Sequence, residues 1–375
     1  MKNPFYLQEV PVVSPFCDRT SELRELHSFA EAKAHVVLYS PRRFGKTSLV
    51  KRVQKTLADA GAITIFSDLF GVASVEDVAA RIAKAVFAVT HKRESVWKRA
   101  LQVIQVYRPI LKPDPEGGIS LSVEPSSPGA TGLQLLEETI ASLGEFVRTT
   151  EGLVHVALDE FQEIVTLKEA LQIEAVLRTE IQRQVASYFF VGSRRRVLLG
   201  IFNERQRPFF QGALNYPLKA LPQNELEEFL GIQFQTGGKP CSEHLAHDIA
   251  RRASYHPYYT QKLAFLVFEG SDVVTMETVA AGHQRLIASE RPVFEAILQG
   301  LSPHQRLLVR AVALEPTGKP LANAYIRKHR LGSVGGVQHS LKYLSEMDLI
   351  ERGDQWEVVD PLLAQWLRGQ VEESL

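Results

Sequence analysis

Ser40–Thr47 reads Ser-Pro-Arg-Arg-Phe-Gly-Lys-Thr and follows an apolar run, His35–Tyr39, directly. An amphipathic stretch begins near Lys46, so the segment joins an expected strand to an expected helix. A loop of this pattern surrounds a phosphate with backbone N–H groups at the positive end of the helix dipole. Lys46 would add charge at the β- and γ-phosphates, and Thr47 would offer its hydroxyl to Mg²⁺. The residues predicted to contact a nucleotide are Ser40, Pro41, Arg42, Arg43, Phe44, Gly45, Lys46, Thr47 and Ser48.

The first position of this loop motif is usually glycine, whereas the chain has Ser40. If φ were positive at that position, serine would cost more than glycine. A basic strand-to-helix turn without a ligand is the alternative interpretation. The strand before the segment and the helix after it favour the phosphate loop, because the motif requires that context.

Two carboxylates, Asp159 and Glu160, end another apolar run, Val154–Leu158. Ligands of parallel sheets bind at the carboxyl ends of the strands. Asp159 is therefore predicted to hold Mg²⁺ beside Thr47, and Glu160 to polarise the attacking water as a general base. A charged corner between a strand and a helix is the alternative for this pair.

Further polar residues follow the same strand ends. Ser193 ends the run Ser187–Ser193 and is predicted to contact the γ-phosphate or the attacking water, and Gln162 is a second candidate. Either could instead cap the next helix. A cation that neutralises charge in the transition state is also expected. The sequence does not choose among Arg178, Arg194, Arg205 and Arg207.

Short apolar runs alternate with amphipathic stretches over the first two hundred residues, which predicts an α/β fold with a parallel sheet covered on both faces. Ala62–Phe66 and Tyr216–Leu221 are further expected strands, and 107–132 is an expected hairpin or loop insertion. Helical patterns fill 224–298. Three helices and a hairpin around Gly353-Asp354, expected to have a two-residue turn, predict a winged helix. We expect domains at 1–223, 224–298 and 299–375.

Composition limits the class of protein. The 375 residues carry 43 Lys+Arg and 43 Asp+Glu, so bulk charge does not hold this chain to nucleic acid. Cys17 and Cys241 are too few for a disulfide framework or a zinc site, and they suit a reducing cytosol. No apolar run approaches the roughly 18 to 20 residues that cross a bilayer, so we expect a cytoplasmic protein without membrane contact.

Taken together, these segments resemble the archaeal-type P-loop ATPases, a branch of the AAA+/STAND class, over almost the whole chain. Ser40–Thr47 resembles a variant phosphate loop that accepts serine at its first position. The other matching segments are Phe16–Arg19 with Glu22 and Leu23, Leu158–Gln162, Phe190–Ser193, Tyr255–Tyr258 with Gln261, and Asp360–Leu362 with Trp366. Tyr255 departs from the usual glycine of its motif. Gly212 stands where the family often has an arginine finger, so no finger is carried over.

The resemblance implies a sheet of order 5-1-4-3-2, a helical lid, a C-terminal winged helix and ATP with Mg²⁺ as cofactors. It also implies that Arg19 lies near the adenine and that His256 belongs to the part of the lid that senses nucleotide. The residues alone do not distinguish ATP from GTP.

The winged-helix segment is locally basic, because seven cations accompany one acid, Glu315, between Ser302 and Tyr343. The cations are Arg306, Arg310, Lys319, Arg327, Lys328, Arg330 and Lys342. Non-specific DNA contact and contact with a protein partner, including self-association, both fit this pattern.

The leading hypothesis is an ATP-hydrolysing switch in which the nucleotide closes the lid through His256 and repositions the winged helix. The alternatives are an ATP-sensing DNA-binding regulator with little turnover and a scaffold with a vestigial site.

Overall fold

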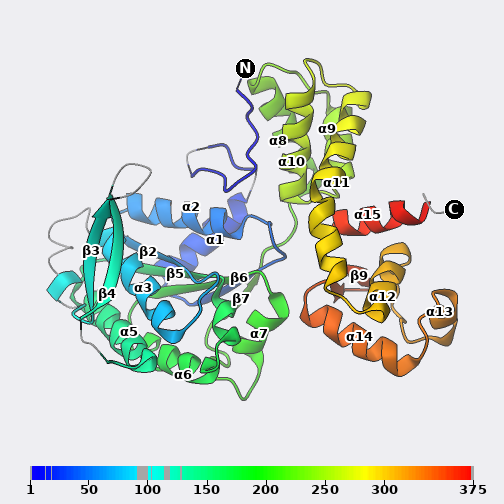
Figure 1. Ribbon diagram of the computed structural model, residues 1–375. Coiled ribbons are helices and arrows are strands. Elements are labelled where there is room, and N and C mark those ends of the chain that lie inside the picture. Colours follow the sequence, from blue (N-terminus) through cyan, green and yellow to red (C-terminus); the bar gives the residue numbers. More distant parts are fainter. Residues whose placement is uncertain are drawn as a thin grey trace. The chain divides into compact units, whose positions relative to one another are not determined.

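The computed structural model describes residues 2–12, 14–17, 19–90, 100–102, 104–113, 119–126 and 129–372 (Figure 1). The chain divides into two compact units. The sheet unit comprises Arg19–Arg42 and Lys46–Leu218, and the helical unit comprises the segment before Arg19, Arg43–Gly45 and the chain from Lys219 onward. Each unit has its own hydrophobic core.

The sheet unit contains a five-stranded parallel sheet in the order β2-β5-β6-β1-β7. The strands are β1 (Val36–Tyr39), β2 (Ile63–Asp68), β5 (Val154–Asp159), β6 (Ser187–Gly192) and β7 (Leu214–Pro217). In order of appearance in this sheet these are strands 1 to 5, so the predicted order 5-1-4-3-2 is confirmed. The fifth strand begins two residues before the predicted Tyr216–Leu221 and ends at Pro217.

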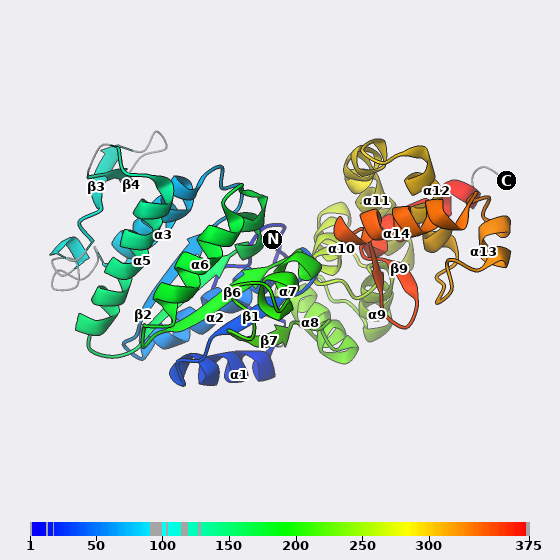
Figure 2. The ribbon, with the colours of Figure 1, turned by 90° about the horizontal axis from the view of Figure 1, so that it is seen from below.

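Helices cover both faces of this sheet, as Figure 2 shows. One face carries α1 (Thr20–Glu31) and α2 (Lys46–Asp59), and the other carries α3 (Val75–Thr90), α5 (Gly132–Thr149) and α6 (Ala170–Ile181). The strands β1, β5 and β6 are therefore buried at every position, which explains their continuous apolar runs. A short 3₁₀ helix, η1 (Phe161–Thr166), follows β5, and α7 (Arg195–Asn203) follows β6.

The predicted insertion is a hairpin. Strands β3 (Tyr107–Pro113) and β4 (Ile119–Pro125) pair antiparallel, with Tyr107 opposite Pro125. The hairpin packs on the flank of α3, where Leu121 and Val123 contact the core.

The helical unit contains first a group of four helices and then a winged helix. The four are α8 (Gln223–Thr236), α9 (Glu243–Arg252), α10 (Pro257–Gly270) and α11 (Met276–Gln299). The winged helix comprises α12 (Pro303–Leu314), α13 (Asn323–Lys328), α14 (Val334–Glu346), β8 (Ile350–Arg352), β9 (Trp356–Val358) and α15 (Pro361–Glu372).

Local signals set the ends of these elements. A capping box begins α12, because Ser302 Oγ accepts from the Gln305 N–H and Gln305 Oε1 accepts from the Ser302 N–H. The hairpin β8–β9 differs from the prediction. Arg352 pairs with Trp356, so three residues rather than two connect its strands. Among the described residues, no helix is long and apolar enough to cross a membrane.

Candidate active site

The phosphate loop joins the end of β1 at Tyr39 to the start of α2 at Lys46. Gly45 has φ of +83° and Arg43 has φ of +63°, whereas Ser40 is not among the residues with positive φ. Serine at the first position of the motif is therefore free of the strain that a positive φ would impose. Glycine is required at Gly45 instead. A side chain there would have room, but residues other than glycine rarely adopt its positive φ.

Lys46 is buried inside this loop and is 6% exposed. Its Nζ donates to the carbonyl oxygens of Ser40 (3.0 Å) and Pro41 (2.8 Å) and to Ser40 Oγ (3.2 Å). Burial lowers the pKa of Lys46 to about 8, although Glu160 and Asp159 oppose this shift. The ammonium group is thus held by neutral oxygens. The negatively charged oxygens of a phosphate could take their place.

Thr47 and Asp159 meet directly at the carboxyl end of the sheet. Thr47 Oγ1 lies 2.6 Å from Asp159 Oδ2, and Asp159 Oδ1 accepts the Glu160 N–H at 2.9 Å. Burial raises the pKa of Asp159, and the nearby carboxylates Glu160 and Asp68 raise it further. The two oxygens of this pair are of the kind that Mg²⁺ prefers.

These donors fit Mg²⁺ in the way that nucleotide enzymes hold it. The described residues contain no group of three or more His, Cys, Asp or Glu that could hold a metal by themselves. Mg²⁺ commonly takes one or two protein ligands and completes its shell with water and phosphate oxygens. A hydroxyl and a carboxylate in contact match that requirement.

Glu160 is fixed by two side chains. Gln162 Nε2 and Ser193 Oγ both donate to Glu160 Oε2, the latter at 3.1 Å. Glu160 has φ of +49°, a left-handed conformation that turns the chain from β5 into η1. Glu160, Gln162 and Ser193, which the sequence analysis places at or just after strand ends, thus form one hydrogen-bond network.

The network depends on Gly192 and Gln162, whose mutual contact no sequence pattern predicts. A Cβ on Gly192 would overlap Gln162 Oε1, so only glycine leaves space for this amide. Gln162 is fully buried, and its Oε1 has no hydrogen-bond partner among the described residues. Asp68, opposite Asp159 in the ladder, was also missed, although it ends an apolar strand as Asp159 does.

Arg19 precedes α1 in the same unit. It is 2% exposed, has φ of +71°, and its Nη1 lies 2.6 Å from Glu22 Oε1. Its Nη2 is buried without a hydrogen-bond partner among the described residues. Asp18, the preceding residue of the resembling segment, lies outside the described residues. Ser48 is buried in the first turn of α2, and Arg42 is exposed.

His256 belongs to the helical unit and caps α10, because its ring Nδ1 accepts from the Tyr259 N–H at 3.5 Å. Within that unit its ring lies edge-on to Phe44, with centroids 4.9 Å apart. Arg43 contacts Glu290 at 3.1 Å and lies over the Tyr258 ring.

The four candidate arginines differ in how they are held. Arg207 forms an ion pair with the fully buried Glu174, and Arg194 lies 3.9 Å from Glu163. Arg178 packs near Gly212. Arg205 is exposed and has no ion pair with any described residue. None of these contacts joins an arginine to Glu160.

Two parts of the chain match the models of known protein families. Residues 16–188 match a family described as an ATPase domain predominantly from Archaea, and residues 292–369 match a "probable winged helix domain". No curated protein matches the chain.

Two solved structures have a similar fold over nearly their full length. The Walker-type ATPase PABY2304 of Pyrococcus abyssi has a TM-score of 0.70 at 17% identity, covering 94% of this chain and 96% of that one. The ORC2 protein of Aeropyrum pernix, in ADPNP–ADP complexes, has a TM-score of 0.62 at 14% identity, covering 98% and 96%. At these identities the likeness concerns the fold. Residues 16–188 are therefore an ATPase domain of the family found predominantly in Archaea, with a parallel-sheet P-loop fold, and a C-terminal winged helix domain follows.

Proposed function

We propose that this protein binds ATP with Mg²⁺ at Ser40–Ser48 and hydrolyses its terminal phosphoanhydride bond. The observation that carries the proposal is the contact between Thr47 Oγ1 and Asp159 Oδ2, with Lys46 and Glu160 beside them. This arrangement supports a triphosphate because each group has a separate task that phosphoryl transfer requires.

Thr47 and Asp159 would hold Mg²⁺, which neutralises charge on the phosphate oxygens when bound. Lys46 would leave its loop oxygens for the β- and γ-phosphates. Glu160 would accept a proton from the attacking water, and Ser193 would orient that carboxylate or contact the γ-phosphate. Arg19, with a buried Nη2 that lacks a partner among the described residues, is assigned to the adenine side.

We further propose that nucleotide state is coupled to the helical unit through His256, with residues 1–223, 224–298 and 299–375 as the working domains. The ring contact between Phe44 of the loop and His256 supports this assignment. The protein would then act as a switch, set by ATP and reset by hydrolysis, in the cytoplasm. ADPNP and ADP in the ORC2 complexes support ATP rather than GTP.

DNA contact by the winged helix is the second candidate function. Arg330 and Lys319 are exposed and have no ion pair with any described residue, which favours phosphate contact. An ORC1 protein of Aeropyrum pernix that shares the fold was solved in complex with DNA. In that role the protein would sense ATP and turn it over slowly.

Substitution of the proposed base tests the hydrolytic function. Glu160→Gln keeps the size of the side chain but cannot accept a proton. We expect ATP binding to persist while phosphate release falls by about 10² to 10³-fold, measured with and without DNA. Glu151→Gln, at an exposed turn of the same unit, is the matched control. Parental turnover in Glu160→Gln would refute the role of Glu160.

A further inference from the structure

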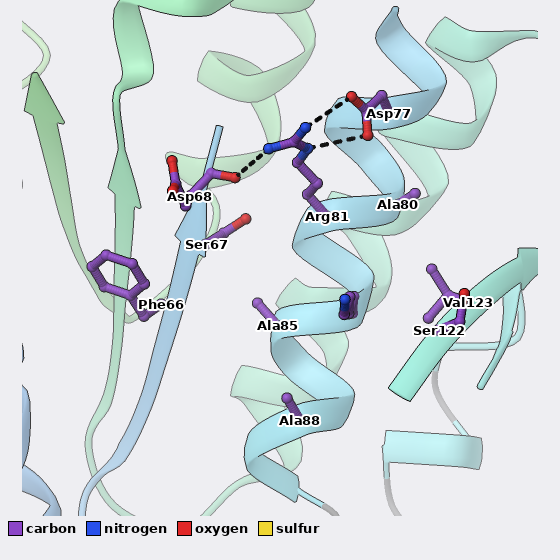
Figure 3. A pocket seen from close by; sticks show the side chains of 11 residues that line it. Phe66, Ser67, Asp68, Asp77, Ala80, Arg81, Ala85, Ala88, Ser122 and Val123 are labelled. Atoms are coloured by element: carbon purple, nitrogen blue, oxygen red, sulfur yellow. Dashed lines mark hydrogen bonds and ion pairs between the residues drawn. The ribbon is translucent and has the colours of Figure 1, made fainter. Parts of the chain in front are cut away.

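A groove of about 520 Å³ lies at the edge of the sheet unit, and one of the residues that line it is Asp68, the neighbour of Asp159 in the sheet. Three elements line it: the edge strand β2, helix α3 and strand β4 of the hairpin (Figure 3). Ala80, Ala85 and Ala88 of α3 contribute small side chains, and Ser122 and Val123 form the wall on β4. The groove therefore has space for a ligand of several residues' size.

The edge of β2 that borders this groove has unpaired backbone groups. The Ile63 N–H donates to Leu153 O and the Leu69 N–H to Asp159 O, so the odd-numbered residues of β2 pair with β5. Backbone groups alternate along a strand, so Thr64, Phe66 and Asp68 face the open edge. Among the described residues β2 pairs with no other strand.

Arg81 occupies only the far end of this edge. Its guanidinium donates to the carbonyl oxygen of Asp68 (3.1 Å) and to both carboxylate oxygens of Asp77 (Figure 3). It also donates to the carbonyl oxygen of Phe70 at 2.8 Å. The N–H and C=O groups of Thr64 and Phe66 remain without a ladder partner in the described part of the chain. Such an edge is a template for an added strand.

The side chains in the groove indicate which strand would fit. Ser67 is 2% exposed, and its hydroxyl has no hydrogen-bond partner among the described residues. Asp77 is balanced by Arg81, and Asp68 Oδ1 accepts the Phe70 N–H at 2.8 Å. Lys84 is exposed and forms no ion pair with any described residue. Two charges of the groove therefore have no ion-pair partner among the described residues: the cation Lys84 on α3, and the carboxylate of Asp68 at the end of β2.

We propose that this groove binds an extended peptide segment of a partner protein, which adds a strand to β2 and places one carboxylate at Lys84. The peptide backbone pairs with Thr64 and Phe66. Apolar side chains on the same face of the peptide as the carboxylate pack over the alanines of α3, because alternate residues of a strand share a face. Lys84 suits one acidic residue beside it, whereas the carboxylate of Asp68 in the same groove disfavours a polyanion such as DNA.

A peptide array tests the proposal even though the partner is unidentified. The probes are acetylated seven-residue peptides of alternating valine and threonine, with every residue type at the central position. We expect the full-length protein to prefer central glutamate or aspartate over central lysine by about tenfold, the size of one charge-assisted contact. Lys84→Glu should invert that preference, whereas Lys168→Glu, on another exposed lysine of the same unit, should not.

The backbone contribution is tested separately. Thr64→Pro removes one N–H from the open edge, where proline is tolerated, and should weaken every peptide of the array. Amide hydrogen exchange gives a second readout: bound peptide should slow exchange at Phe66 in the parent protein. The proposal is overturned if no peptide has a higher affinity for the parent protein than for the Lys84→Glu variant. It is also overturned if the exchange rate of the Phe66 amide does not change when a peptide binds. Neither outcome bears on ATP hydrolysis at Glu160.

Discussion

At the scale of single residues, hydrogen bonds between side chains and loop oxygens organise the candidate site. Glu160 receives hydrogen bonds from Ser193 and Gln162, and Lys46 is held by three oxygens of its own loop. Preorganised groups avoid a reorganisation cost when charge moves during the reaction. The roles of the neighbours of Glu160 are therefore separable from nucleotide binding.

Ser193→Ala removes one of the two donors to Glu160 while Thr47 and Lys46 keep their contacts. We expect kcat for ATP hydrolysis to fall about tenfold with little change in the Kd for ATP, because one hydrogen bond to a charged group is lost. Steady-state kinetics and equilibrium titration measure the two quantities. Ser289→Ala, whose hydroxyl bonds only a local carbonyl, is the control. An unchanged kcat would contradict the positioning role.

His155, on β5, makes stability depend on pH. Its side chain is fully buried, Gln54 Nε2 lies 3.1 Å from its Nδ1, and burial lowers the pKa of His155 to about 3. The folded pKa lies below the unfolded value of 6.5, so the unfolded chain binds a proton that the folded chain does not. The stabilisation is present above pH 6.5 and is lost as pH falls towards 3.

Because of His155, we expect the free energy of unfolding to be about 2 kcal/mol lower at pH 5 than at pH 7. Urea unfolding of the parent and of His155→Gln at both pH values measures the difference, which the variant should lack. His244→Gln, at an exposed position of α9, should behave as the parent. An equal pH dependence in His155→Gln would show that this histidine is not the cause.

At the scale of elements, the hairpin β8–β9 of the winged helix carries mostly acidic side chains. Glu351 and Glu357 face each other across the hairpin, and Asp354 lies in its turn, against one cation, Arg352. Burial and mutual repulsion raise the pKa of Glu357. The exposed part of α14 offers Lys342, which lies near Glu346. The hairpin is therefore poorly suited to phosphate contact.

We expect the parent protein to bind duplex DNA weakly and with a shallow salt dependence. The triple variant Glu351→Gln, Asp354→Asn, Glu357→Gln removes three negative charges and should bind more tightly, with a larger slope of log K against log salt. Fluorescence anisotropy at several salt concentrations measures both. Tight binding by the parent, with no gain in the triple variant, would favour the DNA-binding function instead.

The order of strands, loops and helices was sufficient to predict part of the fold and of the candidate site from the sequence. Strand–loop–helix order predicted that a helix begins near Lys46, as α2 does, and the carboxyl ends of β5 and β6 placed Glu160 beside Ser193. The fifth strand was misplaced because β7 is an edge strand whose Leu214 is 50% exposed, so it lacks an apolar run. The contact of Gln162 with Glu160 depends on the 3₁₀ turn and on the space at Gly192, which no residue pattern encodes.

At the scale of the whole molecule, the chain forms two compact units, each with its own hydrophobic core. The sheet unit contains the groups proposed for phosphoryl transfer, and the helical unit contains His256 and the winged helix. Equal numbers of acidic and basic residues leave no net charge to attract a polyanion. The proposed functions therefore depend on local sites, and the first of these is the proposed nucleotide site.

Equilibrium binding of ATP to the full-length protein tests that site most directly. Calorimetric titration with Mg²⁺ should show binding by the parent and by Lys55→Ala, a matched lysine on the exposed side of α2. Lys46→Ala should weaken binding by about a hundredfold, because it removes a charge-assisted contact to the phosphates. Equal affinity in Lys46→Ala and the parent would contradict the account.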